Sequence, residues 1–578
     1  MTIFAGAFNR SGRPVRNSLR EALRQVITRN PNDTVVGFDD KCAFFLKVDI
    51  GAFGESGFHV DSTGFSLMAG EPLLAHDDET SLGRNADLQL LHQEWSQNRW
   101  ERPATARGVF CAMHYQSRDC KLTLVTDKLS IRPLYYYVDS EYVLFGTALR
   151  ILENLCELPK LMDLRAVTEL LAVSVPLSDR TPYANIARLR PAEALQVTQT
   201  EIKRWQYWRW DSIEERDSQP PDLLRGTHQK FVQAVARRLR TDRRTIAYLS
   251  GGLDTRCIVA TLRDRDAEVH TFTFAHPETQ DQVFGAQFAR CAGTRHREIP
   301  VDFTQPADWS MLMANAWQAE RHSKVSSPER PGLVWAGFGG GEALGGVGIE
   351  SESLIELIRN SSLEVAVDAA IAHDGWRFPK RLLTRKFAGA LACLLRLAIH
   401  DEWQNLRFAD PARRYYVFRL IHQELLHFFE HFENIDLHRI EMQLPFLDSD
   451  FLAFVMTIPI QWCLRHNFYT DLLAQFPPTV VSVPWQAYPG HQPCPIRSSK
   501  TVVSQWELRP SSDIRASRGA TLQETRALLR VKPFPDGILR KDALRAACWL
   551  HGLGVRDCQY HLNAARTFLR YWELCNGK

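Results

Sequence analysis

A short stretch of the sequence, residues 248–255, combines the end of a strand, two adjacent glycines and an acidic helix start. It reads Tyr-Leu-Ser-Gly-Gly-Leu-Asp-Thr, with strand-like apolar residues before it and helical apolar spacing after it. Gly251 and Gly252 lack the side chains that would keep a phosphate off the backbone, while successive N–H groups and the helix dipole favour an anion. The stretch therefore predicts a seat for pyrophosphate, with Asp254 placed to hold Mg²⁺ against it.

The glycine loop has a second interpretation, an ordinary strand-turn-helix corner that uses glycine for its positive φ. No Gly-Lys-Ser/Thr follows the glycines, so the pattern differs from a Walker loop. The elements around the loop must decide between the two.

Composition describes a globular chain of 578 residues, long enough for two large domains and an appendage. Apolar residues make up 45%, and 70 basic against 67 acidic residues give a net charge of +3, which predicts no binding to nucleic acid or to an anionic membrane. No signal-peptide pattern or membrane-length apolar run is evident, so we expect a soluble cytoplasmic protein. The twelve cysteines form no Cys-x-x-Cys pair or Cys/His cluster of zinc spacing, which predicts free thiols.

The order of elements predicts a mixed α/β protein. Strand and turn signals make the first ~200 residues β-rich. After the polar run 211–222, strands and helices alternate, which predicts a parallel sheet with helices on both faces. Residues from about 350 to 475 are mostly helical, and the last ~75 form basic amphipathic helices. We expect domains at 1–210 and 223–500 and a helical C-terminal extension at 501–578.

Several segments resemble the asparagine synthetase superfamily, in the family's order. They are Gly108–Ala112, Thr126–Tyr136, Arg188–Ala192 with Tyr207-Trp208, the loop at Ser250, Phe274–Glu278, Gly293–His296 and Glu441–Asp448. The resemblance implies a glutamine-amidotransferase-like domain of the N-terminal-nucleophile type. It also implies a doubly wound parallel-sheet domain of the ATP-pyrophosphatase type, which adenylates a carboxylate.

The same resemblance implies ATP and Mg²⁺ as cofactors. The implied nucleotide-binding residues are Leu249, Ser250, Gly251, Gly252, Leu253, Asp254, Thr255, Phe274, Gly337, Phe338 and Gly339. Gly341 stands where the family has an aspartate that helps hold the metal, so Asp254 and Glu342 are the expected metal ligands, with Glu342 also a catalytic candidate. Gln443 replaces a family arginine, and Trp485 lies near the place of a late family lysine.

The N-terminus departs from family members that hydrolyse glutamine. Those proteins expose a cysteine after methionine removal, because its thiol attacks glutamine, whereas this chain has Thr2. The family's Asn-Gly-Glu loop is reduced to Ala69-Gly70-Glu71. We expect no glutaminase activity, although an N-terminal threonine can act as a nucleophile in principle.

Two further groups of residues are candidates for the site. His438 and Glu441 lie three apart and would share a helix face, as a general acid/base pair or as a satisfied polar pair under the sheet. The run Val483–His491 is a rigid aromatic loop that suits an active-site wall, a peptide contact or core packing.

The sequence as a whole predicts an ATP-dependent amide ligase that releases AMP and pyrophosphate. Family members without glutaminase chemistry include β-lactam synthetases and the macrolactam synthetases that close lasso peptides. The expected substrate bears a carboxylate, and a precursor peptide with a leader-binding protein and a protease as partners fits best. The alternatives are an ammonia-dependent asparagine synthetase and a catalytically degenerate scaffold subunit.

Overall fold

The computed structural model describes most of the chain. The described residues are 2–74, 82–216, 219–300, 333–345, 351–498, 502–504 and 511–576, apart from the side chains of Thr2, His438 and residues 511–517.

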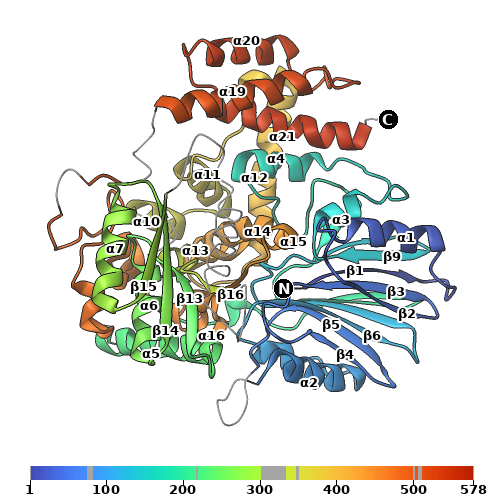
Figure 1. Cartoon of the computed structure of the whole chain (residues 1–578). Coiled ribbons are helices and arrows are strands. Elements are labelled where there is room, and N and C mark those ends of the chain that lie inside the picture. The colour runs from blue at the N-terminus through green and yellow to red at the C-terminus, as the bar shows by residue number, and fades with distance from the viewer. Residues whose placement is uncertain are drawn as a thin grey trace.

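Two six-stranded antiparallel sheets form the N-terminal part (Figure 1). The first has the order β10-β8-β9-β1-β3-β2, from β1 (Thr2–Asn9), β2 (Val35–Asp40), β3 (Ala43–Asp49), β8 (Tyr135–Val138), β9 (Tyr142–Gly146) and β10 (Ala187–Arg188). The second has the order β12-β11-β7-β6-β5-β4, from β4 (Phe58–Val60), β5 (Gly64–Gly70), β6 (Phe110–Gln116), β7 (Lys121–Thr126), β11 (Glu193–Val197) and β12 (Ile202–Gln206).

Side-chain alternation along the strands builds the core of this part. Phe4 and Phe45 point between the two sheets, where they pack with residues such as Leu67, whereas Ala5 faces the other way. Helix α1 (Asn17–Val26) covers the outer face of the first sheet, and α2 (Arg84–Ser96) covers that of the second. The resulting order, helix-sheet-sheet-helix, agrees with the expected N-terminal-nucleophile type of domain.

A five-stranded parallel sheet forms the centre of the second half. Its order is β15-β14-β13-β16-β17, from β13 (Arg244–Tyr248), β14 (Glu268–Ala275), β15 (Arg295–Pro300), β16 (Leu333–Trp335) and β17 (Glu441–Gln443). Helices α6 (Asp254–Asp264) and α7 (Gln280–Ala292) connect β13 to β14 and β14 to β15, and α5 (Pro220–Leu239) precedes the sheet. The order reverses direction between β13 and β16, as in a doubly wound sheet.

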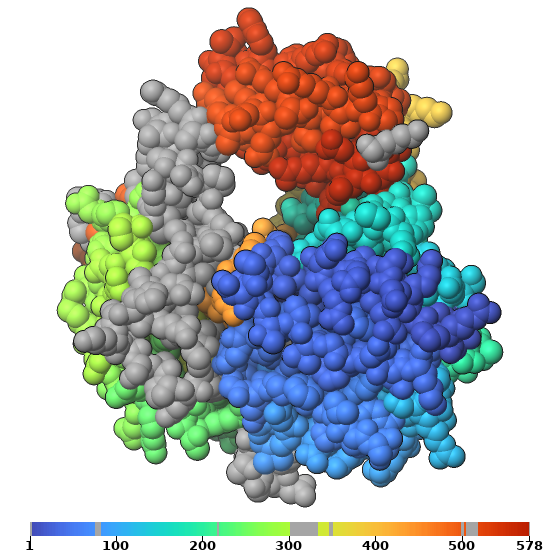
Figure 2. Space-filling model, turned by 45° about the vertical axis from the view of Figure 1, so that its right-hand side comes forward, coloured from blue at the N-terminus to red at the C-terminus, as the bar shows by residue number. Residues whose placement is uncertain are grey.

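Helices account for most of what remains. They include α3 (Leu149–Glu153), α4 (Leu164–Val173), α9 (Gly340–Leu344), α10 (Glu352–Asn360), α11 (Leu363–His373), α12 (Arg385–Asn405), α13 (Pro411–His422), η4 (Glu424–Phe428), α14 (Phe429–Glu433), α15 (Ile435–His438), α16 (Ser449–Val455), α17 (Ile460–Cys463), α18 (Asn467–Leu472), α19 (Ser511–Leu528), α20 (Lys541–Gly552) and α21 (Gln559–Asn576). The last three form the red group at the top of Figure 2, and their apolar faces pack against α4 and α12.

Buried ion pairs join the two sheet-bearing parts. Arg132 pairs with Glu441, and both side chains are almost fully buried. Arg29 lies 2.6 Å from the buried carboxylate of Asp436, and Arg240 lies 2.7 Å from that of Glu71. Breaking such a pair by removing one partner costs about 3–5 kcal/mol, because a charge then remains buried without its counterion.

The mixed α/β class, the parallel sheet after residue 222 and the helical C-terminal part are confirmed by these elements. The domain boundaries stay predictions. In the described ranges, no helix combines the length and the apolar character needed to cross a bilayer.

Candidate active site

The glycine loop lies at the point where the parallel sheet reverses its strand order. Strand β13 ends at Tyr248, α6 begins at Asp254, and the neighbouring strand β16 leads into α9. Ligands bind at such reversals, outside the carboxyl ends of the strands. A cavity of about 620 Å³ opens here, and the described residues that line it are Ser250, Gly252, Leu253, Asp254, Asp281, Gly341, Glu342, Arg419, Glu424, His466, Tyr469, Gln486, Tyr488, Pro489 and His491.

Hydrogen bonds within the loop fix its shape. The Ser250 N–H donates to the Thr255 hydroxyl (3.1 Å), that of Gly251 to Asp281 (3.1 Å) and that of Gly252 to the Ser250 hydroxyl (3.2 Å). A Cβ on Gly251 would lie 2.6 Å from the Gln280 carbonyl oxygen, so this glycine permits close packing against the start of α7. Helix α6 has no side-chain cap, so its first N–H groups and its dipole are the part of the loop best placed for an anion.

A buried arginine holds the loop from behind. The guanidinium of Arg256 donates five hydrogen bonds to main-chain carbonyls, two in the glycine loop at Gly251 and Gly252 and three in the segment 480–484. Burial lowers its pKa to about 10, so the group remains charged at neutral pH. Arg256 therefore ties the glycine loop to the segment that leads into the aromatic run at Val483.

Asp254 and Glu342, the two predicted metal ligands, line the same cavity. The Tyr469 hydroxyl donates a 2.6 Å hydrogen bond to Asp254. Burial and the nearby charge of Glu342 raise the pKa of Asp254 to about 7. The pKa of Glu342 is also raised, by the protein atoms around it and by the charge of Glu424, although part of its surface is accessible to solvent. Acidic groups that disfavour one another's charge in this way gain stability when a cation lies between them.

The glycine run after β16 packs against Asp254. A Cβ on Gly337 would lie 2.8 Å from the Asp254 Cβ, and one on Gly340 would lie 2.4 Å from its Oδ1. Gly339 has a φ of +89°. These glycines let the backbone approach the carboxylate closely.

Seven of the eleven predicted nucleotide-binding residues are not among the described residues that line the cavity. Gly251 and Thr255 belong to the glycine loop, and Gly337 and Gly339 belong to the glycine run after β16. Leu249 is buried, Phe274 packs edge-on against Tyr248, and Phe338 packs against Phe428. The other four, Ser250, Gly252, Leu253 and Asp254, line the cavity.

His466 is a cavity residue that the sequence analysis missed. Arg465 and His466 both have positive φ, 53° and 61°, a conformation that side chains adopt at a cost and that clusters at active sites. A Cβ on Gly345 would lie 1.9 Å from the His466 ring, and one on Gly341 would lie 3.8 Å from its Nε2. The two glycines, four residues apart, thus leave room for the imidazole on one side of α9.

The imidazole of His466 is uncharged at neutral pH. Its Nδ1 lies 3.2 Å from the Nδ1 of His491. Burial and the charge of His491 lower its pKa to about 4. A neutral imidazole in a cavity can accept a proton from a substrate.

The aromatic run at 483–491 contributes to both the wall and the core. Gln486, Tyr488 and His491 line the cavity, and the Gln486 N–H donates a 2.9 Å hydrogen bond to the Gly251 carbonyl. Trp485 is buried beside Arg256. Gln486, Tyr488 and His491 thus form part of the cavity wall, whereas Trp485 packs in the core.

The prediction that His438 and Glu441 share a helix face was wrong. Arg439 has a φ of +56°, which ends α15 at His438, and Glu441 begins strand β17. The Glu441 carboxylate is fully buried and pairs with Arg132 of the N-terminal part. This places Glu441 in a polar pair beneath the sheet, while the side chain of His438 lies outside the described residues.

Glu71 corresponds to the glutamate of the family's glutamine-binding Asn-Gly-Glu loop, and here it contacts residues of the second half of the chain. It is 5% exposed and accepts hydrogen bonds from Arg240 (2.7 Å) and Gln443 (3.1 Å). The residues around it enclose a cavity of only about 20 Å³.

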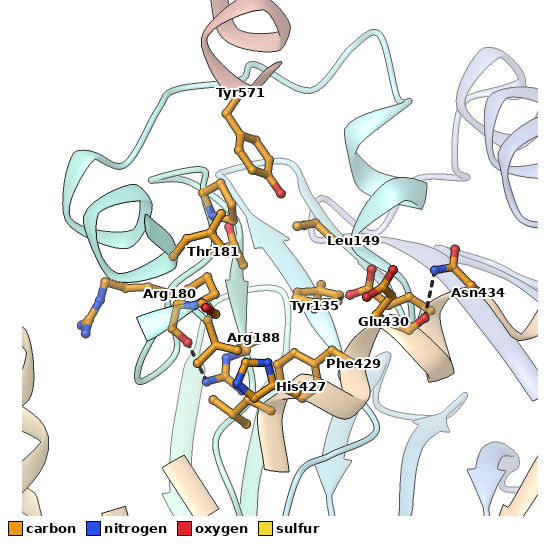
Figure 3. A pocket seen from close by; sticks show the side chains of 17 residues that line it. Tyr135, Leu149, Arg180, Thr181, Arg188, His427, Phe429, Glu430, Asn434 and Tyr571 are labelled. Atoms are coloured by element: carbon orange, nitrogen blue, oxygen red, sulfur yellow. Dashed lines mark hydrogen bonds between the residues drawn. The ribbon is translucent and has the colours of Figure 1, made fainter. Parts of the chain in front are cut away.

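A second cavity, of about 330 Å³, is lined by residues of the segment 426–434, close in the chain to Glu424 of the first cavity. Figure 3 shows Tyr135, Phe429 and His427 around it, with Tyr571 reaching down from α21. Buried Arg188 borders the cavity and stacks on the Phe429 ring at 4.8 Å, and its Nε and Nη1 have no hydrogen-bond partner. This cavity joins the N-terminal part, the central helices and the C-terminal helix.

Comparison with known proteins matches both halves of the chain. A family profile described as "Glutamine amidotransferase domain" matches residues 81–208, and one described as "Asparagine synthase" matches residues 226–327. The chain is 26% identical over 215 residues to asparagine synthetase [glutamine-hydrolyzing] 3 of Bacillus subtilis. These matches support the asparagine synthetase superfamily as the group of proteins that this chain is similar to.

Other matches to this superfamily are partial. The match to the Bacillus protein covers 35% of this chain and 34% of that protein. A putative asparagine synthetase 2 of Methanocaldococcus jannaschii is 27% identical over 167 residues, which is 27% of this chain and 32% of that protein. The chain thus spans about a third of the length of these curated relatives. A solved structure of glutamine phosphoribosylpyrophosphate amidotransferase from B. subtilis, complexed with ADP and GMP, matches 58% of this chain and 74% of that chain at 9% identity, but its TM-score of 0.24 adds nothing to the fold described above.

Proposed function

We propose that this protein forms an amide bond between a carboxylate and an amine, and that it consumes ATP and releases AMP and pyrophosphate. One observation carries the proposal. The uncapped start of α6, the carboxylates of Asp254 and Glu342 and the neutral imidazole of His466 all border one cavity at the reversal of a parallel sheet.

The residues of this cavity fit ATP and Mg²⁺. Mg²⁺ prefers carboxylate oxygens together with substrate phosphates, and two carboxylates with raised pKa values supply the former. The first turn of α6 supplies N–H groups for phosphate oxygens. When bound, ATP would supply the leaving group that makes a carboxylate reactive toward an amine.

The chain's own residues then have separate tasks. Asp254 and Glu342 would hold the metal. The guanidinium of Arg256 holds the glycine loop against the segment 480–484. Tyr488 forms part of the cavity wall. His466 is the proposed acceptor of the proton that the attacking amine must lose, because its uncharged ring borders the cavity.

We propose that glutamine is not the nitrogen donor. Thr2 offers no thiol at the position of the family's cysteine. Glu71 is occupied by Arg240 and Gln443, which leaves little space for a glutamine beside it. The amine therefore comes directly from a second substrate.

We further propose that the substrate is a precursor peptide that is closed into a macrolactam, delivered with the help of a leader-binding protein and a protease. Glu424 lines the first cavity and Leu426 lines the second, so the two cavities border the same short helix η4, which supports a substrate that extends from one to the other. The second cavity offers aromatic rings at Phe429 and Tyr571 and polar side chains at Arg180, Thr181 and Glu430, a combination that suits a peptide. A single amino acid would need no such second site.

The reaction type is tested by product chromatography after incubation with ATP, Mg²⁺ and a precursor peptide with its partners. We expect AMP and pyrophosphate. Asp254→Ala should abolish turnover, whereas Asp264→Ala, an exposed acid in the last turn of the same helix, should not. ADP as the main product, or no Mg²⁺-dependent ATP binding by calorimetry in the unaltered protein, would contradict the proposal.

The peptide site is tested by steady-state kinetics. Tyr571→Ala should raise KM for the peptide and leave KM for ATP unchanged, because Tyr571 borders only the second cavity. Leu574→Ala, at an exposed position of the same helix, is the matched control. Turnover of free aspartate with ammonia, or a peptide KM that Tyr571→Ala does not change, would count against a peptide substrate.

A further inference from the structure

Three side chains with metal-binding atoms meet in the N-terminal part, far along the chain from the adenylation cavity. They are His59 on β4, Asp61 just after it and His92 on α2. The His92 Nε2 lies 3.1 Å from Asp61 Oδ1, and the His59 Nε2 lies 3.9 Å from Asp61 Oδ2. All three ligand atoms lie within 4.8 Å of one another.

Strand register explains why these groups meet. His59 is paired with Ser66 across β4 and β5, and Ser66 with His114 across β5 and β6. Directly paired residues point to the same face of a sheet, so these three side chains form a row. Helix α2 lies over that face, as the neighbouring labels of α2 and β4 in Figure 1 indicate, and places His92 above the row.

The ring of His92 is fixed from its other side. Its Nδ1 lies 2.9 Å from the Ser66 hydroxyl, which also lies 2.9 Å from the Nδ1 of His114. The ring is fully buried, and its Nε2 faces Asp61 and the Thr63 hydroxyl, which lies 3.0 Å away. Hydrogen bonding of the second ring nitrogen is the usual way in which a protein orients a metal-binding histidine.

The charges of the group suit a cation. Asp61 supplies a carboxylate, and His59 and His92 supply imidazole nitrogens, a donor set that divalent transition metals favour. Asp61 is also part-exposed, with 38% of its side chain accessible, so an ion can reach it from solvent.

We propose that His59, Asp61 and His92 bind a divalent transition-metal ion, for which Zn²⁺ is the best match. Zinc takes imidazole nitrogen and carboxylate oxygen at about 2.0–2.2 Å in a tetrahedron, which sets neighbouring ligand atoms about 3.3 Å apart. The three ligand atoms lie within 4.8 Å of one another, so side-chain rotations must bring them about 1.5 Å closer to reach that geometry. The Thr63 hydroxyl or a water molecule completes the set.

The ion would connect an edge strand to the helix that covers it. Strand β4 is the last strand of its sheet, and its Phe58 and Val60 are exposed. A metal bound to His59 and His92 ties β4 to α2 and so protects this edge. Its nitrogen ligands also distinguish it from the all-oxygen pair Asp254 and Glu342, so the two sites select different metals.

The test uses the full-length protein after removal of metals with a chelator. Co²⁺ should produce the visible absorption of tetrahedral cobalt, and Zn²⁺ should abolish it by competition. Calorimetry with Zn²⁺ alone should show a site whose affinity falls at least tenfold in His59→Ala and in Asp61→Asn, both of which change accessible groups. His373→Ala, an exposed histidine of α11, should have no effect.

Ser66→Ala gives a second readout, because Ser66 touches no metal in this arrangement and acts only through His92. We expect it to weaken Zn²⁺ binding by about 10–100-fold. Absence of the cobalt absorption, or equal Zn²⁺ affinity in the unaltered protein, His59→Ala and Asp61→Asn, would overturn the proposal. None of these outcomes bears on the proposed ligase reaction, whose residues lie in the other half of the chain.

Discussion

Replacing Gly341 by aspartate probes how many acidic groups the adenylation cavity can hold. Gly341 lies in helix α9 and is not among the glycines with positive φ. A Cβ at this position would make ordinary 3.8 Å contacts with Asp254 Oδ2 and His466 Nε2. The backbone therefore accepts the side chain, and the new carboxylate lies beside Asp254.

The size of the effect follows from Coulomb's law. Two carboxylates about 5 Å apart at an effective dielectric constant of about 20 repel by about 3 kcal/mol. Replacing a glycine within a helix stabilises the folded protein by about 1 kcal/mol. Without metal, Gly341→Asp should thus lower the free energy of unfolding by about 2 kcal/mol. With a cation bound, the repulsion is relieved, so Mg²⁺ affinity in the presence of ATP should rise by up to about 100-fold.

The assay is thermal denaturation and calorimetry with ATP across a range of Mg²⁺ concentrations. Gly341→Asn is the matched control, because asparagine has the same shape as aspartate and no charge. If the Asp and Asn variants show the same dependence on Mg²⁺, position 341 does not face the cation, and the assignment of Asp254 and Glu342 as its ligands is refuted.

Three further changes have defined outcomes. Gly345→Ala should lower Tm and turnover together, because a methyl group there overlaps the His466 ring, and unchanged turnover would contradict the position of that ring. Arg256→Met should destabilise the protein by about 3–5 kcal/mol in denaturant unfolding, since its carbonyl partners lose their donor; an unchanged midpoint would show that the loop is held by other contacts. Burial raises the pKa of Glu433 to about 7, so its stabilising contribution is present at low pH and is lost as the pH rises through 7. Glu433→Gln keeps an acceptor for the Tyr135 hydroxyl, so its free energy of unfolding should be similar to that of the unaltered protein near pH 5. At pH 8 the free energy of unfolding of the variant should be higher by about 3 kcal/mol. A Tm of the variant below that of the unaltered protein at pH 8 would contradict this prediction.

Local patterns predicted the parts of the site that are continuous in the chain. The strand, glycine turn and helix around Ser250 are encoded by neighbouring residues, and the structure places them where the pattern predicts. Glu342 follows a glycine run whose spacing is equally local. Both carboxylates line the cavity.

Other parts depend on contacts between distant segments. His466 lies more than a hundred residues after α9, and its only trace in the sequence is the spacing of Gly341 and Gly345. The spacing of His438 and Glu441 predicted a helix face, but short apolar runs do not distinguish helix from strand. The group around His59 has no zinc-finger spacing, because strand register and not sequence proximity assembles it.

The ion pairs between the two halves constrain the evolution of such a protein. Glu441 and Asp436 are buried against Arg132 and Arg29, which belong to the amidotransferase-like half. A chain shortened to its second half would lose both ion pairs and would open to water the interface that now surrounds them. Whether or not it handles glutamine, the first half thus serves the second as a structural counterpart, so the loss of its catalytic residues does not by itself make it dispensable.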